Sequence, residues 1–331
     1  MRQFWELLPL HGKILSDMKS DMKIVFLDAA SIGEDVSLEP IASLGELVTY
    51  PFTSPEQVEE RIVDCDILII NKVQIRKQQI DWGRNLKLIC IAATGTNNVD
   101  MEYAASKGIP VKNVAGYSTQ SVAQVTMAML LGLSCHTAYY DSKVKSGEYT
   151  RGNLVSDVTR KWGELSGQRL GIIGLGTIGS RVAELAEGFG LEVVYYATSG
   201  KPHSDKYRSL SLEDLLKTSD FISVHAPLND RTKNLVTYDK LALCKNTAKV
   251  INIGRGGIIN EEDLVKALND NMIEGIGIDV FSKEPIPEDS PFFKIEDKTR
   301  AILLPHIGWT SREARTLLVA KIAENIKSYS I

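Results

Sequence analysis

Apolar residues in this chain gather in short runs rich in Val and Ile, separated by stretches in which apolar positions recur with helical spacing. A short run that is apolar throughout is typical of a parallel strand buried on both faces. The helical stretches begin with helix-start residues at Ser211, at Asn260 and in the capping box Thr310–Glu313. Strands and helices in repeated alternation indicate an α/β fold. The predicted strands are 23–29, 65–71, 86–92, 108–114, 169–176, 191–197, 220–226, 249–254, 274–280 and 301–305.

One long helical stretch, "SVAQVTMAMLLGLSCHTAYYDSKVKSG", interrupts this alternation and begins near Ser121. A second series of strands and helices follows it, so we place a domain boundary there. A length of 331 residues is also what two domains need. Residues 1–22 precede the first predicted strand, lack the apolar core of a signal peptide, and are interpreted as an N-terminal extension.

Charge and cysteine usage narrow the function classes. The 42 acidic residues slightly outnumber the 38 basic ones, and no Lys/Arg block is present, so we expect neither a nucleic-acid nor a membrane partner. No apolar run approaches the roughly 20 residues of a membrane span. The cysteines are widely spaced and lack metal-ligand spacing, so we expect no metal site and a reduced, cytoplasmic protein. They are Cys65, Cys90, Cys135 and Cys244.

A glycine-rich turn opens the second series, in "RLGIIGLGTIGSRVAELA". Gly174 would allow a tight turn, Gly176 a close approach of pyrophosphate, and Gly179 close packing of helix on strand. The N–H groups at the helix start, including those of Thr177 and Ile178, would face the phosphates. Since a strand precedes this turn and a helix follows it, we predict dinucleotide binding.

The end of the next strand bears on the choice between NAD and NADP. An NAD site usually places a carboxylate there to bind the ribose 2′-hydroxyl, whereas this chain has Ala197. Thr198, Ser199 and Lys201 follow and offer groups for a 2′-phosphate. The cofactor is therefore NADP or NAD. The missing carboxylate slightly favours NADP, but NAD stays open because hydroxyl groups also bind a bare ribose.

Four polar residues stand at the ends of later predicted strands, which is where open α/β sheets bind ligands. Arg255 follows "INIG", Asp279 and Glu284 lie in "GIGIDVFSKEP", and His306 lies in "LLPHIGWTS". Taken singly, such an arginine is often a surface residue, and such a histidine is often structural. Their common position favours a functional site.

In this order, the glycine turn, "RG", "DVF..EP" and "PH.G" resemble the signature of the D-isomer-specific 2-hydroxyacid dehydrogenases. The resemblance covers nearly everything from Lys23 to the end. It implies two Rossmann-like, doubly wound parallel-sheet domains. One is a discontinuous, flavodoxin-like substrate-binding domain of residues 23–120 and 304–331. The other is an NAD(P)-binding Rossmann domain of residues 121–303.

The resemblance also assigns roles. It makes Arg255 the substrate-binding arginine, His306 the acid/base and Glu284 its carboxylate partner. Reduction of a 2-keto acid adds a hydride to the carbonyl carbon and a proton to the oxygen, and histidine supplies protons near neutrality. A buried Glu284 would favour the protonated imidazole, and Arg255 offers a planar fork for a carboxylate. Asp279 would orient the nicotinamide or the local network.

Two further segments match the family. In "AATGTNNVD", the backbone N–H groups of Thr94 and Gly95 should receive the substrate carboxylate, and Asn98 should hold that loop. The segment "VHAPL" matches the family's cofactor-contacting strand end, which places its histidine on the cofactor side. The expected cofactor contacts here are His225, Ala226 and Pro227.

Within the family, "NKVQI", "ATGTNNVD", "YSTQSVAQ" and "HIGWTSREAR" look closest to the glycerate dehydrogenase (hydroxypyruvate reductase) branch. Hydroxypyruvate or glyoxylate is then the expected substrate. Formate dehydrogenases of this fold have glutamine where this chain has Glu284, which argues against that activity. Trp309 would either close the substrate pocket or pack at the domain junction.

An alternative from another class is a dinucleotide-sensing binding protein, since the C-terminal-binding-protein corepressors keep this fold and the same Arg, Glu and His. Those corepressors generally carry extra disordered tails, so the enzyme is favoured. Family members usually dimerise through the cofactor domain around its long helix. We therefore expect a homodimer that contacts the helix beginning near Ser121.

Overall fold

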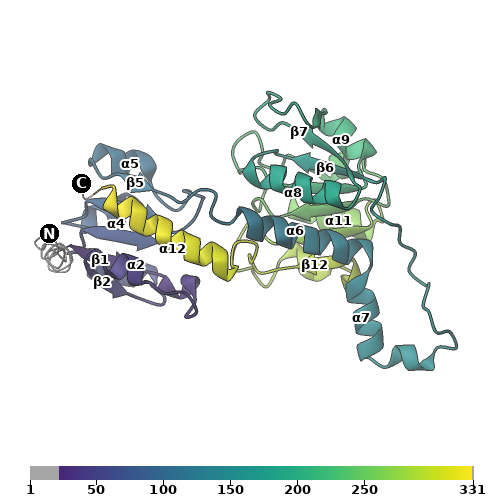
Figure 1. Ribbon diagram of the computed structural model, residues 1–331, viewed down its shortest axis with the longest axis horizontal. Helices are drawn as coiled ribbons and strands as arrows, with labels where there is room; N and C mark the ends of the chain where they lie inside the picture. Colours follow the sequence, from purple (N-terminus) through teal and green to yellow (C-terminus); the bar gives the residue numbers. More distant parts are fainter. Residues whose placement is uncertain (1–21, 330–331) are drawn as a thin grey trace, which may run out of the picture. The chain divides into compact units, whose positions relative to one another are not determined.

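A computed structural model describes residues 22–329 of the chain (Figure 1). The residues divide into two compact units, a first unit of residues up to Tyr117 together with those from Arg312, and a second unit of Ser118–Ser311. The expected N-terminal extension, residues 1–22, lies outside the described residues except for Met22. Across residues 22–329, none of the helices is both long and apolar enough to cross a membrane.

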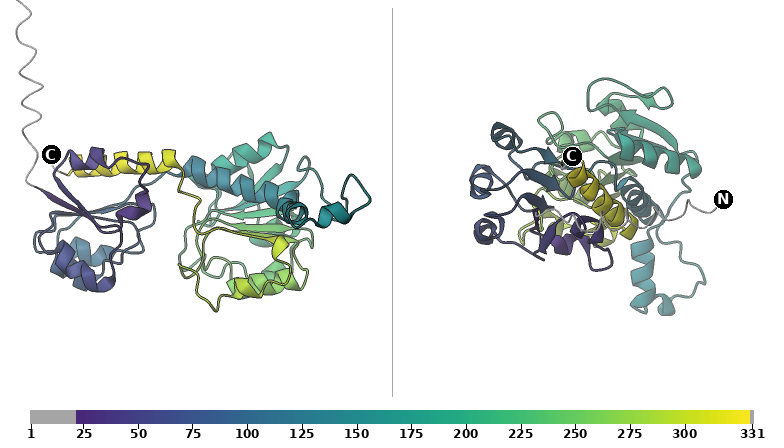
Figure 2. Two further views of the ribbon diagram at one scale, coloured as in Figure 1. Left: turned by 90° about the horizontal axis from the view of Figure 1, so that it is seen from below. Right: turned by 60° about the vertical axis from the view of Figure 1, so that its left-hand side comes forward.

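The first unit is built on a five-stranded parallel sheet in the order β2-β1-β3-β4-β5. This is the flavodoxin-like order. Figure 2 shows α12 and α2 on one face of this sheet and α3, α4 and α5 on the other. The elements are β1 (Lys23–Phe26), η1 (Ala29–Ile32), α2 (Glu39–Ala42), β2 (Glu46–Thr49), η2 (Pro55–Gln57), α3 (Val58–Ile62), β3 (Ile67–Ile70), α4 (Lys77–Trp82), β4 (Leu88–Ile91), α5 (Met101–Ser106), β5 (Val111–Lys112) and α12 (Arg312–Lys327).

The second unit is built on a seven-stranded parallel sheet in the order β12-β11-β10-β9-β6-β7-β8, with the Rossmann switch point between β6 and β9. Two apolar clusters cover its faces, and one of them includes α6 and α8. The elements are α6 (Thr119–Ser134), α7 (Thr137–Lys145), η3 (Glu148–Arg151), β6 (Arg169–Ile173), α8 (Thr177–Gly188), β7 (Glu192–Tyr196), β8 (Arg208–Ser209), α9 (Leu212–Thr218), β9 (Phe221–Val224), α10 (Tyr238–Leu241), β10 (Lys249–Asn252), α11 (Glu261–Asn269), β11 (Gly275–Ile278), η4 (Pro291–Lys294), η5 (Lys298–Arg300) and β12 (Ala301–Leu303).

The predicted fold class, two doubly wound parallel-sheet domains, is confirmed. Two helix starts also lie where the sequence indicated, since Ser211 accepts from the N–H of Asp214 and Asn260 accepts from that of Asp263. The sequence did not reveal the edge strands β2 and β8. β2 is at most half-buried and β8 has only two residues, so neither shows the continuous apolar run of an inner strand.

The long helix predicted from Ser121 is two helices, α6 and α7, which corrects that expectation. His136 lies between them in the left-handed region, with φ 51°. Its Nε2 lies 3.3 Å from the carbonyl oxygen of Lys161 and 3.5 Å from a carboxylate oxygen of Glu274. These tertiary contacts, which helical periodicity does not report, accompany the break.

The predicted return to the first domain at residue 304 also differs from the structure, in which the first unit resumes at Arg312. The segment 304–311 is hydrogen-bonded to the second unit instead. The N–H of Leu304 donates to Ile278 O, and the N–H groups of Ile307 and Gly308 donate to Asp279. These bonds anchor the segment to the end of β11, so the chain changes unit only where α12 begins.

Candidate active site

The glycine turn after β6 is shaped by close backbone contacts. Gly174 has φ +93°, and a Cβ there would lie 2.9 Å from Ala226 N and Cα. A Cβ at Gly179 would lie 2.5 Å from Gly174 O, whereas a Cβ at Gly176 would meet no atom within 4 Å. Gly174 and Gly179 are therefore required by packing, and Gly176 faces open space.

Helix α8 begins directly at this turn. Thr177 and Ile178 are its first residues, and Gly176 at its N-cap provides no side chain to cap them. The first N–H groups of a helix lack partners within the helix, and they carry its positive dipole end. Uncapped N–H groups beside open space at Gly176 fit the pyrophosphate of a dinucleotide.

The turn after β7 contains the residues expected near the ribose. Ala197 is buried, Thr198 is partly buried, and Ser199 and Lys201 are exposed. The N–H of Gly200 donates to Ala197 O at 2.9 Å, which closes the turn. The Ser199 hydroxyl donates to Lys201 O at 3.1 Å, so it supports the turn from within.

The end of β9 packs between two glycine turns. A Cβ at Gly254 would lie 2.9 Å from Ala226 O, and Pro227 O accepts from the Thr232 hydroxyl at 2.6 Å. His225 Nε2 lies 2.8 Å from the Ser223 hydroxyl, while its buried Nδ1 has no hydrogen-bond partner within residues 22–329. Burial lowers the pKa of His225 to about 3, so this imidazole is neutral near pH 7.

Arg255 lies in a turn that a buried asparagine holds. Asn252, at the end of β10, donates to Arg255 O at 2.9 Å and accepts from Gly254 N at 3.2 Å. A Cβ at Gly256 would lie 2.0–2.2 Å from the backbone of Phe281 and Ser282, so this turn packs directly on the segment after β11. Arg255 forms no ion pair within the described residues, which suits it to an anionic ligand.

His306 and Glu284 are in direct contact, since His306 Nδ1 lies 2.7 Å from Glu284 Oε2. The other oxygen, Oε1, accepts from the N–H of Phe281 at 3.0 Å. A buried Glu284 was expected from the sequence, but 29% of the Glu284 side chain is exposed, and 23% of the His306 side chain is exposed. His306 has φ 56°, a left-handed conformation that is uncommon for a residue other than glycine.

Asp279 holds the backbone beside His306. It is 1% exposed, and its two oxygens accept from the N–H groups of Ile307 at 2.8 Å and Gly308 at 2.9 Å. Burial raises the pKa of Asp279, although these two hydrogen bonds oppose the rise. A Cβ at Gly308 would lie 2.8 Å from Asp279 Oδ2, and Trp309 follows, partly exposed. Asp279 therefore serves the local network, one of its two expected roles.

In the first unit, the expected carboxylate-binding loop follows β4. Neither Thr94 N nor Gly95 N donates a hydrogen bond within residues 22–329. Asn113, which the sequence analysis missed, donates to Thr94 O at 2.6 Å. Asn98 donates to the carbonyl oxygens of Asn71 and Val73, so it ties this loop to the end of β3 as expected.

A second residue missed by the sequence analysis, Asp28, supports that end of β3. Its buried carboxylate accepts from the backbone N–H groups of Asn71, Lys72 and Val73 at 2.5–3.2 Å. Burial raises the pKa of Asp28 against the effect of these bonds. Asp28 follows the first apolar run, the signal that identified Asp279, so its place at a strand end could have revealed it.

Comparisons with known proteins agree with this arrangement. Residues 127–308 match the family described as D-isomer specific 2-hydroxyacid dehydrogenase, NAD binding domain. A hydroxypyruvate reductase of Blautia hydrogenotrophica is 33% identical, covering 93% of this chain and 97% of the relative. A glycerate dehydrogenase of Methylorubrum extorquens is 32% identical, covering 93% and 96%.

A solved structure is similar as well. The D-lactate dehydrogenase of Aquifex aeolicus, complexed with NAD and lactic acid, has 25% sequence identity and a TM-score of 0.81, covering 93% of this chain and 95% of that chain. The expected family is thus confirmed, and so is a nicotinamide dinucleotide as its cofactor. The chain belongs to the D-isomer-specific 2-hydroxyacid dehydrogenase family and is an NAD(P)-dependent oxidoreductase.

Proposed function

We propose that this protein reduces hydroxypyruvate and glyoxylate with a nicotinamide dinucleotide. The observation that carries the proposal is the 2.7 Å contact between His306 and Glu284, in the same unit as Arg255 and the uncapped start of α8. The names of the two relatives, a hydroxypyruvate reductase and a glycerate dehydrogenase, support this substrate class.

A dinucleotide held at the glycine turn of Gly174, Gly176 and Gly179 would supply the hydride for the carbonyl carbon. Protonated His306 gives its Nε2 proton to the carbonyl oxygen and becomes neutral, which completes the 2-hydroxy acid. Glu284, on Nδ1, stabilises the imidazolium and fixes the orientation of the ring. Because Nδ1 faces Glu284, Nε2 is the nitrogen available to the substrate.

Arg255 is proposed to bind the substrate carboxylate, and the Thr94–Gly95 backbone is proposed as an anion-binding loop of the first unit. Support for Arg255 is its lack of an ion pair within residues 22–329, and support for the loop is its two N–H groups without acceptors. Both are suited to an anion, Arg255 through its planar fork. Trp309 is proposed to line the substrate pocket.

NADPH is proposed as the preferred cofactor. Its support is Ala197, which leaves the end of β7 without the carboxylate that binds a ribose 2′-hydroxyl. The turn that follows carries the exposed Lys201 and no acidic residue between 197 and 201. A carboxylate at that strand end would repel a 2′-phosphate, whereas Ala197 does not.

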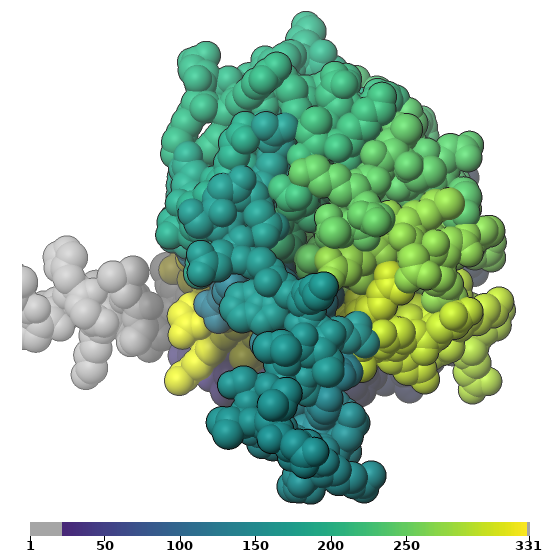
Figure 3. Space-filling model, turned by 90° about the vertical axis from the view of Figure 1, so that its right-hand side faces the viewer, coloured from purple at the N-terminus to yellow at the C-terminus, as the bar shows by residue number. Residues whose placement is uncertain are grey.

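A homodimer is proposed to form through the second unit. The segment 137–162, here called the arm, projects from this unit, as the teal atoms in Figure 3 show. Its exposed apolar side chains form a surface that a second copy would cover. They are Val144, Tyr149, Leu154, Val155, Val158 and Trp162, with exposed fractions of 38–91%.

Light scattering on a sizing column tests this assembly, because a dimer has twice the 36.6 kDa mass of the chain. Val155→Glu, at the most exposed of these positions, should shift the mass toward that of one chain. A mass of 36.6 kDa for the unaltered protein would contradict the dimer.

A cytoplasmic location, expected from the cysteines, stays a prediction.

The decisive experiment for the activity is nucleotide oxidation by the purified protein. NADPH and NADH are compared against hydroxypyruvate, glyoxylate, pyruvate and 2-ketoisocaproate. Fast turnover with hydroxypyruvate or glyoxylate is the expected result. Tight nucleotide binding without turnover of any substrate would contradict the proposal and favour a dinucleotide-sensing protein instead.

A further inference from the structure

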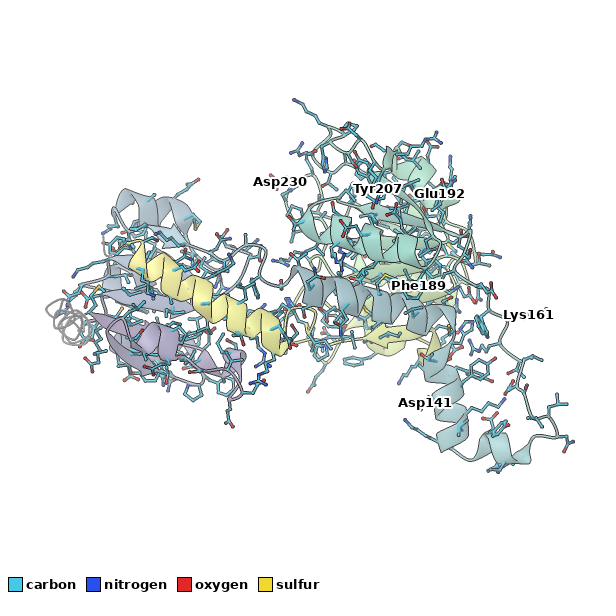
Figure 4. The ribbon with its side chains drawn as sticks, in the orientation of Figure 1. Asp141, Lys161, Phe189, Glu192, Tyr207 and Asp230 are labelled. Atoms are coloured by element: carbon cyan, nitrogen blue, oxygen red, sulfur yellow. The ribbon has the colours of Figure 1, made fainter. Side chains whose placement is uncertain are left out.

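The turn after β7 is contacted by an arginine from another part of the second unit. Arg231 follows β9, and its guanidinium donates to Ser199 O at 3.1 Å. Figure 4 labels the preceding residue, Asp230, on this loop. The loop is held in place because Arg231 N donates to Asn229 Oδ1 at 3.0 Å and Asn229 N donates to the Thr232 hydroxyl at 2.8 Å.

A histidine fixes the same turn to the glycine loop. His203 Nε2 lies 2.7 Å from Leu175 O, between Gly174 and Gly176. The hydroxyl of Tyr195, on β7, accepts from His203 N at 2.9 Å. The segment 197–203 is thereby held beside the glycine turn at which the pyrophosphate of the dinucleotide is expected.

The charges around this turn favour an anion. Arg231 and Lys201 are exposed, and neither forms an ion pair within residues 22–329. Asp230 is exposed and precedes Arg231 in the chain, so it reduces but does not cancel the two positive charges.

Since one N–H of Arg231 is used at Ser199 O, the guanidinium is oriented by the turn and retains further donors. A phosphate accepts such donors in charge-assisted hydrogen bonds, which are stronger than bonds to a neutral hydroxyl. The Ser199 hydroxyl, in contrast, donates within the turn. An arginine therefore supplies the donors that the hydroxyl does not.

We propose that Arg231 is a specificity-determining residue that binds the 2′-phosphate of NADPH, together with Lys201. This inference rests on the proposed dinucleotide cofactor. It adds that the site selects NADPH over NADH and that Arg231 makes this selection. Sequence alone gives no sign of it, because Arg231 is more than thirty positions from Ala197 and lies in a different loop.

The test is calorimetric binding of adenosine 2′,5′-bisphosphate and of adenosine 5′-monophosphate, which differ only by the 2′-phosphate. The unaltered chain should bind the bisphosphate at least about tenfold more tightly. Arg231→Ala should weaken the bisphosphate about tenfold and change the monophosphate less than about twofold. Lys217→Ala, which removes an exposed lysine on α9, is the charge-matched control and should change neither.

Equal affinity of the unaltered chain for the two nucleotides would overturn the proposal. So would an equal loss of both in Arg231→Ala, since Arg231 would then only hold the turn. Arg231→Lys, which keeps the charge, should recover part of the selectivity. Because the binding measurement needs no keto acid, its failure is distinguishable from failure of the reductase proposal, in which no substrate turns over with either nucleotide.

Discussion

In both units the loops proposed to bind ligands lie at the ends of parallel strands, but the two units hold these loops by different means. In the second unit, Gly174, Gly254 and Gly256 let one backbone segment pack directly on another. In the first unit, side chains hold the loops instead. Asp28 accepts hydrogen bonds from three backbone N–H groups, and Asn98 donates to two carbonyl oxygens. Glycine packing leaves a recognisable motif, whereas support by side chains leaves isolated polar residues that no short pattern identifies.

The largest expected effect is on turnover, at His306, the residue proposed to transfer the proton. His306→Ala should lower turnover by about 10² to 10⁴-fold, the usual scale of acid/base catalysis. Its melting temperature should change little, because His306 is partly exposed. Steady-state kinetics and a thermal melt check both points. Unchanged turnover would remove His306 from the proposed mechanism.

Glycine packing in the second unit is tested next. Gly256→Ala should destabilise the protein by about 3 kcal/mol, because its Cβ would lie 2.0–2.2 Å from the backbone of Phe281 and Ser282. Gly176→Ala is the matched control, since its Cβ would meet no atom within 4 Å. That variant should melt like the unaltered chain and yet bind nucleotide more weakly. Denaturant unfolding and nucleotide titration distinguish the two, and equal melting of both variants would contradict the packing argument.

The side-chain support of the first unit gives a smaller effect. Asp28→Ala leaves the N–H groups of Asn71, Lys72 and Val73 without their acceptor, which should cost about 2 kcal/mol of stability. Asp35→Ala removes an exposed carboxylate paired with Arg315 and should have less effect. Thermal melts compare the two. If they melt alike, Asp28 does not support the loop.

The stability of the second unit should depend on pH through His225, at the end of β9. The pKa of His225 is about 3 in the folded protein and near 6.5 when unperturbed, so the unfolded chain binds the proton first. Stability should therefore fall as pH drops from about 6.5 toward 3, with a loss of up to about 2 kcal/mol at pH 5. His225→Gln should show a shallower fall between pH 7 and pH 5 in thermal melts. An equal fall in both proteins would assign the effect to other groups.

Much of the fold followed from local pattern. The inner strands were predictable as apolar runs because both of their faces are buried. The glycine turn was recognisable because the spacing of its glycines reflects close backbone contacts. The half-exposed strand β2 and the break at His136 were not predictable this way. Each depends on what lies across the sheet or beside the helix, and no window of sequence contains that information.

The candidate site divides in the same manner. The sequence by itself determined the family, the parallel architecture and the residue types for hydride-linked proton transfer, because these are encoded in motifs of short range. Only the tertiary structure decided that Glu284 reaches His306, that Asp279 serves the turn beside it, and that Arg231 meets the turn after β7. Hydrogen bonds act over about 3 Å in space, whatever the separation along the chain, so the folded backbone decides which polar groups become partners.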